Sequence, residues 1–404
     1  YHPSRERLEP PAVSPNVLII PANKEQIIDL GDTLPESGIL RVRARASKVS
    51  SDDRRFPSLR LKFGNQPSNN SQTSERVDNH DVAIHASPKQ PKFYQWDIPL
   101  SEVPRNSYRG VTKMGDTPNP TEYLIFQNVH QSPSKNSADI QIDYLEITTP
   151  FHEQWPPESH TRIFIDRENR TDEIAYAREV LTRFMPRAWR RAVTDSEIDR
   201  KMALFAKVRP VCDDTQQAMI EVLATVLASP HFLYLAQANP TSRGLEYLSN
   251  YELATRLSMF LWSSAPDEEL LLLAAKGKLD NPKILIRQTK RMLDDARSQR
   301  FAKHFVRQWL GMQLLDFLNV EKETYPQFDA ELKEAMQQEP IAFFQDVLQQ
   351  NRSVMDFLHA DYALVNERLA QHYGLPEVYG NQFREVELTP TDRRGGLLTQ
   401  AGLL

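Results

Sequence analysis

Cysteine and glycine are scarce in this chain of 404 residues. Its single cysteine, Cys212, excludes an intrachain disulfide, a cysteine-rich zinc site and a Cys-x-x-Cys-His haem attachment within the chain. The 13 glycines form neither a Gly-x-Gly-x-x-Gly pattern nor a Walker loop. A nucleotide phosphate-binding loop is therefore not expected.

Long apolar runs and an excess of one charge are also missing. No stretch reaches about 18 apolar residues, the length that a transmembrane helix needs, so we expect no membrane span. The 49 Lys and Arg residues are balanced by 54 Asp and Glu residues, for a net charge of −5. A nucleic acid partner is not expected, because phosphate binding needs a basic surface.

The first 150 residues have the pattern of β-strands. Short runs alternate apolar and polar residues with a period of two, as half-buried strands do. These runs are Leu40–Ala46, Ser58–Phe63, Val82–His85, Phe93–Ile98, Tyr123–Phe126 and Ile140–Ile147. Many short strands between polar loops predict an antiparallel β-sandwich over residues 1–150, followed by a linker over 151–170.

From about residue 171 the apolar period becomes helical. Thr194 with Glu197, and Ser249 with Glu252, form capping boxes at two helix starts, and Asn281-Pro282 opens a third helix. Glycines that end helices are expected at Gly277, Gly311 and Gly374. The pattern predicts an almost all-α region of about eight to ten helices, divided into modules over residues 171–240 and 241–404.

Aromatic side chains in the predicted sandwich are candidates for binding sugars, whose C–H faces stack on rings. The candidates are Tyr94, Trp96, Tyr108 and Tyr123. About half of them are expected in the core instead. In the helical region, Trp262 and Trp309 have aliphatic neighbours, so core packing is the favoured interpretation for both.

Two carboxylates lie in the last predicted strand of the sandwich. Asp143 and Glu146 are three residues apart, so strand parity places them on opposite faces. One of them can contribute to a Ca²⁺ site, but a cross-strand ion pair is the favoured alternative.

Four polar residues of the helical region are candidates for a shared pocket: His304, Asp361, His372 and Arg394. His304 is either an axial ligand of a metal or haem or, as favoured, a hydrogen-bonded structural histidine. Arg394 precedes Gly395-Gly396, a pair that suits a plain loop or an anion-binding turn.

Several motifs resemble the helical modules of planctomycete cytochrome-associated proteins of unknown function. They run in order from about residue 180 to the last residue and include the segments 187–197, 227–234, 251–267, 308–311, 361–367 and 394–400. Residues 35–160 resemble, more weakly, the carbohydrate-binding-type jelly roll that often precedes these modules.

The resemblance implies an exported protein, periplasmic or on the cell surface, with c-type haem on segments flanking this region. It implies no established reaction and no catalytic residues. The favoured hypothesis is a non-catalytic scaffold whose sandwich binds a polysaccharide or cell-surface glycan and whose helices dock haem domains for electron transfer. The alternatives are an oxidoreductase or hydrolase acting on polysaccharide, with its site in the helical region, and a purely structural role.

Overall fold

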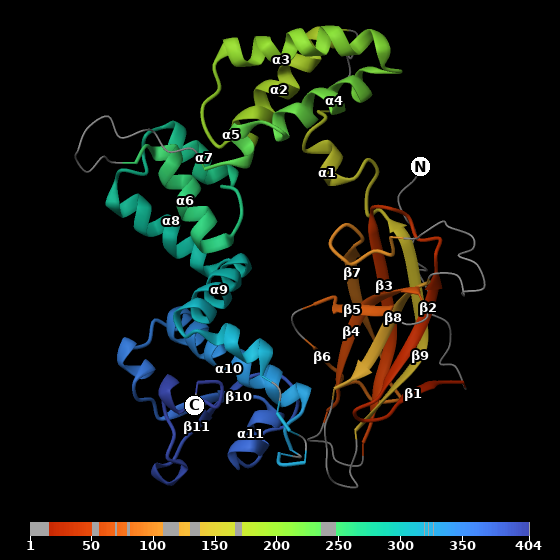
Figure 1. The fold of residues 1–404 in the computed structure, drawn as a ribbon, viewed down its shortest axis with the longest axis vertical. Coiled ribbons are helices and arrows are strands. Elements are labelled where there is room, and N and C mark those ends of the chain that lie inside the picture. The colour runs from red at the N-terminus through yellow and green to blue at the C-terminus, as the bar shows by residue number, and fades with distance from the viewer. Residues whose placement is uncertain are drawn as a thin grey trace. The chain divides into compact units, whose positions relative to one another are not determined.

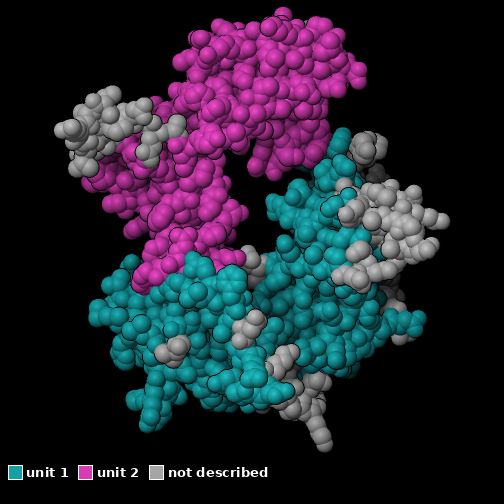
Figure 2. Space-filling model, viewed as in Figure 1, with its two compact units in different colours: residues 1–155, 310–347, 351–404 teal, residues 156–309, 348–350 magenta. Residues whose placement is uncertain are grey.

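The computed structural model describes residues 16–50, 56–68, 71–78, 81–107, 121–129, 138–165, 172–235, 248–318, 320–321, 323–325 and 327–403. The chain forms two compact units (Figure 2). Unit 1 comprises residues 1–155, 310–347 and 351–404, and unit 2 comprises residues 156–309 and 348–350. The sequence predicted domains that follow one another along the chain. In the structure, residues 310–347 and 351–404 belong instead to the same compact unit as the amino-terminal β-strands.

The amino-terminal part of unit 1 is a sandwich of two antiparallel sheets (Figure 1). One sheet has the strand order β1-β9-β3-β7, and the other has the order β2-β8-β4-β5 with β6 paired to β4. The strands are β1 (Leu18–Ile20), β2 (Glu25–Gly31), β3 (Ile39–Val49), β4 (Ser58–Ser68), β5 (Ser71–Arg76), β6 (Val82–Ala83), β7 (Lys92–Pro99), β8 (Thr121–Asn128) and β9 (Asp139–Phe151). The predicted jelly-roll sandwich followed by a helical region is confirmed.

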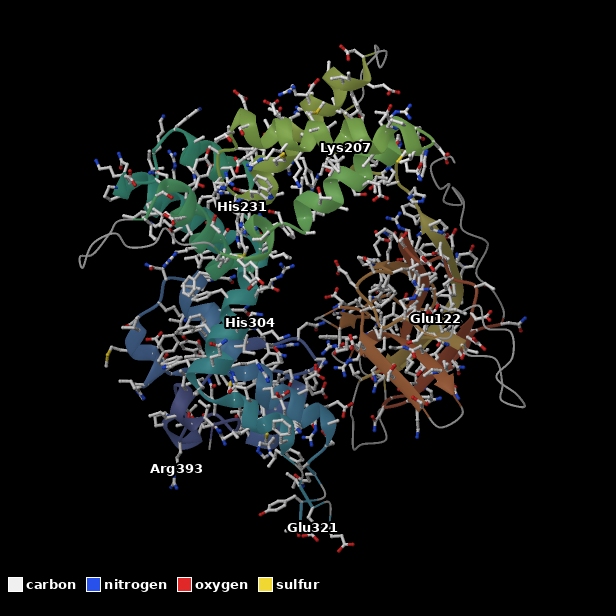
Figure 3. All side chains as sticks on the ribbon, turned by 45° about the horizontal axis from the view of Figure 1, so that its top comes forward. Glu122, Lys207, His231, His304, Glu321 and Arg393 are labelled. Carbon is white, nitrogen blue, oxygen red and sulfur yellow. The ribbon has the colours of Figure 1, made fainter. Side chains whose placement is uncertain are left out.

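The sandwich core follows from the alternation along its strands. In β3, Leu40, Val42 and Ala44 are fully buried, while the arginines between them face the other side of the sheet. One ion pair lies inside the sandwich: Glu122, labelled in Figure 3, is 0% exposed. Its carboxylate accepts two hydrogen bonds from Arg105, of 2.8 and 3.0 Å, which compensate its desolvation.

Unit 2 is helical. Its elements are α1 (Glu158–Thr161), α2 (Glu173–Trp189), α3 (Asp195–Val208), the 3₁₀ turn η1 (Arg209–Val211), α4 (Thr215–Leu227), α5 (Pro230–Leu233), α6 (Asn250–Trp262), α7 (Glu268–Ala275), α8 (Pro282–Asp294), η2 (Ala296–Ser298) and α9 (Gln299–Trp309). Both predicted capping boxes are present, Thr194 with Glu197 at α3 and Ser249 with Glu252 at α6. None of the helices in the described ranges is long and apolar enough to cross a membrane.

The two tryptophans of this region differ in their surroundings. Trp262 is fully buried, and its indole N–H donates a 2.9 Å hydrogen bond to the carbonyl of Met292. Trp309 ends α9 with 51% of its surface exposed, so the expectation that it packs in the core is wrong. Aliphatic sequence neighbours do not decide burial at a helix end, where few residues remain to cover a ring.

The rest of unit 1, residues 310–347 and 351–403, is called the C-terminal part below. Its elements are η3 (Met312–Phe317), α10 (Ala330–Gln349), η4 (Val354–Phe357), β10 (Tyr362–Val365), α11 (Glu367–Tyr373), β11 (Arg384–Glu387), η5 (Pro390–Asp392) and η6 (Leu397–Thr399). Strands β10 and β11 pair antiparallel, a small sheet that the helical pattern did not predict.

Charged side chains join the sandwich to the C-terminal part within unit 1. Arg60 of β4 contacts Asp81 at 2.8 Å and Glu334 of α10 at 3.0 Å. Arg76 of β5 pairs with the same two carboxylates, and Asn381 also donates to Asp81. This network links segments that are far apart in sequence, which no local pattern indicates.

Candidate functional sites

One face of the β1-β9-β3-β7 sheet carries rows of charges and rings. Arg41, Arg43 and Arg45 occupy alternate positions of β3, and their side chains lie on the face of the sheet that points away from the core. Arg41 pairs with Asp97 of β7 through hydrogen bonds of 2.6 and 2.7 Å. Arg43 donates a 2.9 Å bond to Glu146 of β9. We call this surface the arginine face.

Aromatic rings lie between these charges. The Arg43 guanidinium carbon is 4.6 Å from the centre of the Phe93 ring, and that of Arg41 is 3.5 Å from the Phe151 ring. Phe93 and Tyr144 meet edge to face, with ring centres 5.9 Å apart. Their side chains are partly exposed, whereas Phe151 is buried. The arginine face therefore combines rings with fixed charged groups.

A β-bulge places Asp143 on the arginine face. Arg45 stands opposite Tyr144 and the next residue of β3 opposite Ile142, so Asp143 is the extra residue of the bulge. An extra residue reverses the alternation of side chains beyond it. Asp143 and Glu146 consequently share one face, and the expectation of opposite faces is wrong.

Asp143 and Glu146 of β9 are each paired with an arginine of β3. Asp143 accepts two hydrogen bonds from Arg45, of 2.8 and 2.7 Å, with side-chain exposures of only 7% for Arg45 and 2% for Asp143. Glu146 is held by Arg43. This is the cross-strand pairing favoured over a Ca²⁺ site. In the described ranges, no three His, Cys, Asp or Glu side chains gather as a metal centre would require.

Among the described residues, the aromatic candidates Tyr94, Trp96 and Tyr123 do not form a binding strip. Trp96 and Tyr123 are each 5% exposed, and Trp96 packs in the sandwich core against Phe126. Tyr94 is partly buried against that core, and Tyr108 lies outside the described residues. Buried rings cannot stack on a ligand. Strand parity was the missed signal: Tyr94, Trp96 and Ile98 alternate inward, so Phe93 faces outward.

A small pocket lies in the C-terminal part. Its empty volume, mouth included, is about 220 Å³. The lining residues come from α10, β10, α11 and the segment after η5, and they are Glu339, Phe343, Tyr362, Ala363, Tyr373, Arg394, Gly395, Gly396, Thr399 and Gln400.

A buried acid dominates this pocket. Glu339 is 2% exposed, and its carboxyl accepts a 2.6 Å hydrogen bond from the Tyr373 hydroxyl. Burial raises the pKa of Glu339 to about 8, against the opposing effects of Tyr373 and Arg394. Burial beside Glu339 also raises the pKa of Tyr373. Both groups are therefore protonated at neutral pH, an arrangement in which a carboxyl can donate a hydrogen bond.

Of the four polar candidates, only Arg394 lines this pocket. Its guanidinium carbon lies 3.5 Å from the centre of the Tyr373 ring. His372, largely exposed on α11, has its pKa lowered by partial burial of the ring and by Arg368 and Arg394. Asp361 is exposed before β10, and His304 is exposed on α9 of unit 2. Sequence reasoning missed Glu339 and Tyr373, because nothing in a helical pattern marks a buried acid.

Two family models match the helical region. Residues 248–375 match a family described as protein of unknown function DUF1592, also called PSD4, and residues 176–236 match DUF1595, also called PSD5. Glu339 and Tyr373 lie inside the DUF1592 match, and the arginine face lies outside both. No curated protein matches the chain.

Proposed function

We propose that this chain is the binding and scaffold region of an exported, cytochrome-c-like multi-domain protein, and that its sandwich binds polysaccharide through the arginine face. The observation that carries the proposal is the set of partly exposed rings, Phe93 and Tyr144, between arginine–carboxylate pairs. A sugar ring presents C–H groups to an aromatic face and hydroxyls at its edge, so it needs both kinds of group side by side.

The ion pairs suit this role because they are held in place before a ligand arrives. Arg41 and Arg43 are each fixed by a carboxylate on a neighbouring strand. A guanidinium carries N–H donors and a carboxylate carries acceptor oxygens, so an arginine–carboxylate pair presents both kinds of group that a sugar hydroxyl can bond. Fixed partners lose little conformational entropy on binding.

The scaffold part of the proposal is supported by unit 1 itself. The contacts of Arg60 and Arg76 with Glu334 fasten the sandwich to α10. A glycan bound to the sandwich would thereby be tied to the helical region. The resemblance to cytochrome-associated modules supports haem-bearing domains as the partners docked there, with electron transfer between them.

Affinity electrophoresis of the whole chain in gels containing different polysaccharides tests glycan binding. We expect retention on at least one polysaccharide, and we expect Phe93→Ala and Tyr144→Ala to weaken it at least tenfold. Tyr325→Ala is the matched control, because Tyr325 is a 62% exposed ring in the C-terminal part. Migration without retention on every polysaccharide, or retention that neither ring variant changes, would overturn the proposal.

The haem part has a separate test. A visible absorption spectrum and metal analysis of the full-length protein from its native source should show a Soret band with c-type features. A colourless, metal-free protein would remove the electron-transfer role and leave the glycan-binding role to be judged on its own experiment.

A further inference from the structure

Half of the pocket around Glu339 is built by one segment of chain. Arg394, Gly395, Gly396, Thr399 and Gln400 line one side, and α10, β10 and α11 supply the other side. We call residues 394–403 the cover segment. Its turn is held internally, since Arg394 and the backbone N–H of Gly395 each donate a 2.9 Å hydrogen bond to Thr399.

The cover segment is fastened to the rest of unit 1 through Tyr373. The backbone N–H of Ala401 donates a 2.8 Å hydrogen bond to the Tyr373 hydroxyl, which in turn donates to Glu339. The next residue, Gly402, lies so close to α10 that a Cβ atom there would stand 2.4 Å from the Met336 carbonyl oxygen. Closure of the segment therefore depends on the same two residues that form the buried acid pair.

Burial, rather than the groups that face Glu339, favours its neutral form. These groups are Tyr373 from α11, Tyr362 from β10, and Arg394, Gln400 and the backbone N–H of Ala401 from the cover segment. Tyr373, Arg394 and the Ala401 N–H each oppose the rise in the pKa of Glu339. Arg394 is stacked on the Tyr373 ring, and no Arg394–Glu339 ion pair forms within the described ranges. The side-chain oxygen of Gln400 is buried and accepts no hydrogen bond. An ionised carboxylate would thus be buried without a salt bridge and beside an unsatisfied acceptor.

We propose that Glu339, Tyr373, Arg394 and Gln400 form a proton-binding site that controls the cover segment: the segment is closed while Glu339 carries a proton, and it opens when Glu339 ionises. Opening hydrates the carboxylate and uncovers the aromatic wall of Phe343 and Tyr362. This inference is independent of glycan binding, because every group involved lies in the C-terminal part.

The proposal has a quantitative consequence. With the segment closed, Glu339 has a pKa of about 8, and with the segment open it is hydrated and titrates near the ordinary value of 4.5. Because ionisation favours the open form, the ratio of open to closed molecules should rise about tenfold per pH unit between pH 4.5 and about pH 8. Above about pH 8 the ratio should stay constant. Local openings of this kind are measured by amide hydrogen exchange.

Hydrogen–deuterium exchange of the whole chain from pH 5 to pH 9 is the test. After division by the intrinsic rate at each pH, protection of residues 397–403 should fall about tenfold per unit up to about pH 8. In Glu339→Gln, which cannot ionise, protection should stay the same across the range. Glu387→Gln is the matched control: it removes one carboxylate from the exposed side of β11 and should keep the wild-type profile.

Tyr373→Phe provides a second variant that keeps the ring under Arg394 and removes the hydroxyl. The N–H of Ala401 then loses its acceptor, so exchange of residues 397–403 should be severalfold faster even at pH 5. Wild-type protection that does not change with pH, or profiles of wild type and Glu339→Gln that superimpose, would overturn the proposal.

Discussion

The hydroxyl of Tyr373 donates a 2.6 Å hydrogen bond to the carboxyl of Glu339, a side chain with only 2% of its surface exposed. The pair connects α10 to α11, and through the N–H of Ala401 it also holds the cover segment. Because this pair connects three segments, the stability of the C-terminal part should depend on whether Glu339 is charged.

The stability of unit 1 should therefore depend on pH through Glu339. Burial raises the pKa of Glu339 to about 8 in the folded protein, above its ordinary value of 4.5. A raised carboxyl pKa gives stability that is complete below pH 4.5 and is lost as the pH rises toward 8. The slope is about 1.4 kcal/mol per pH unit.

Urea unfolding at pH 5, 6, 7 and 8 measures this slope. Glu339→Gln should remove this pH dependence of the free energy of unfolding. The variant should therefore become more stable relative to wild type with each unit by which the pH rises. Equal slopes for the two proteins would show that Glu339 is not the group responsible.

The tryptophans of the helical region should respond oppositely to truncation. Trp262→Ala removes a fully buried ring and leaves the Met292 carbonyl without its 2.9 Å donor, so we expect a loss of about 3–5 kcal/mol in the free energy of unfolding. Trp309→Ala, at a 51% exposed position, should cost less than about 1 kcal/mol. Denaturant unfolding of the two variants side by side checks the contrast, and similar losses would refute it.

Much of the fold can be predicted from interactions between residues that are close in sequence. The capping boxes at Thr194 and Ser249 predict the starts of α3 and α6, because a cap is a contact between residues three positions apart. The alternation from Leu40 to Ala46 likewise predicts β3 and its buried face. Where short-range chemistry decides the structure, the sequence alone shows it.

The candidate sites depended on long-range relationships, which is why most of their residues were missed. The bulge that turns Asp143 toward Arg45 depends on strand register, and register is not visible within one strand. Glu339 meets Tyr373 across 34 residues of chain, and Glu334 meets Arg76 across 258. Arg394 was found because its double glycine marks a turn, but Glu339 of α10, which lines the same pocket, carries no such mark.

Removing one partner of the ion pair at the bulge should lower the free energy of unfolding strongly, whereas replacing both partners with apolar residues should lower it much less. Asp143→Ala leaves the guanidinium of Arg45, a residue 5% exposed, buried without its carboxylate, and we expect a loss of about 3–5 kcal/mol. The double variant Asp143→Leu with Arg45→Met removes both charges and should recover most of that loss. Chemical unfolding of the single and double variants gives the coupling energy. A coupling near zero would mean that the pair contributes nothing to the sheet.

The cover segment should open permanently when its close approach to α10 is blocked. A Cβ on Gly402 would lie 2.4 Å from the Met336 carbonyl oxygen, a distance that forces the segment away from the helix. In Gly402→Ala we therefore expect fast amide exchange of residues 397–403 at pH 5 as well as at pH 9, with Glu339 titrating near its ordinary range. Gly277→Ala is the control: Gly277 has φ +61° in unit 2 and open space around its Cβ position, so its substitution strains the backbone without touching the segment. If Gly402→Ala kept the wild-type protection at pH 5, the contact with α10 would not be what holds the segment closed.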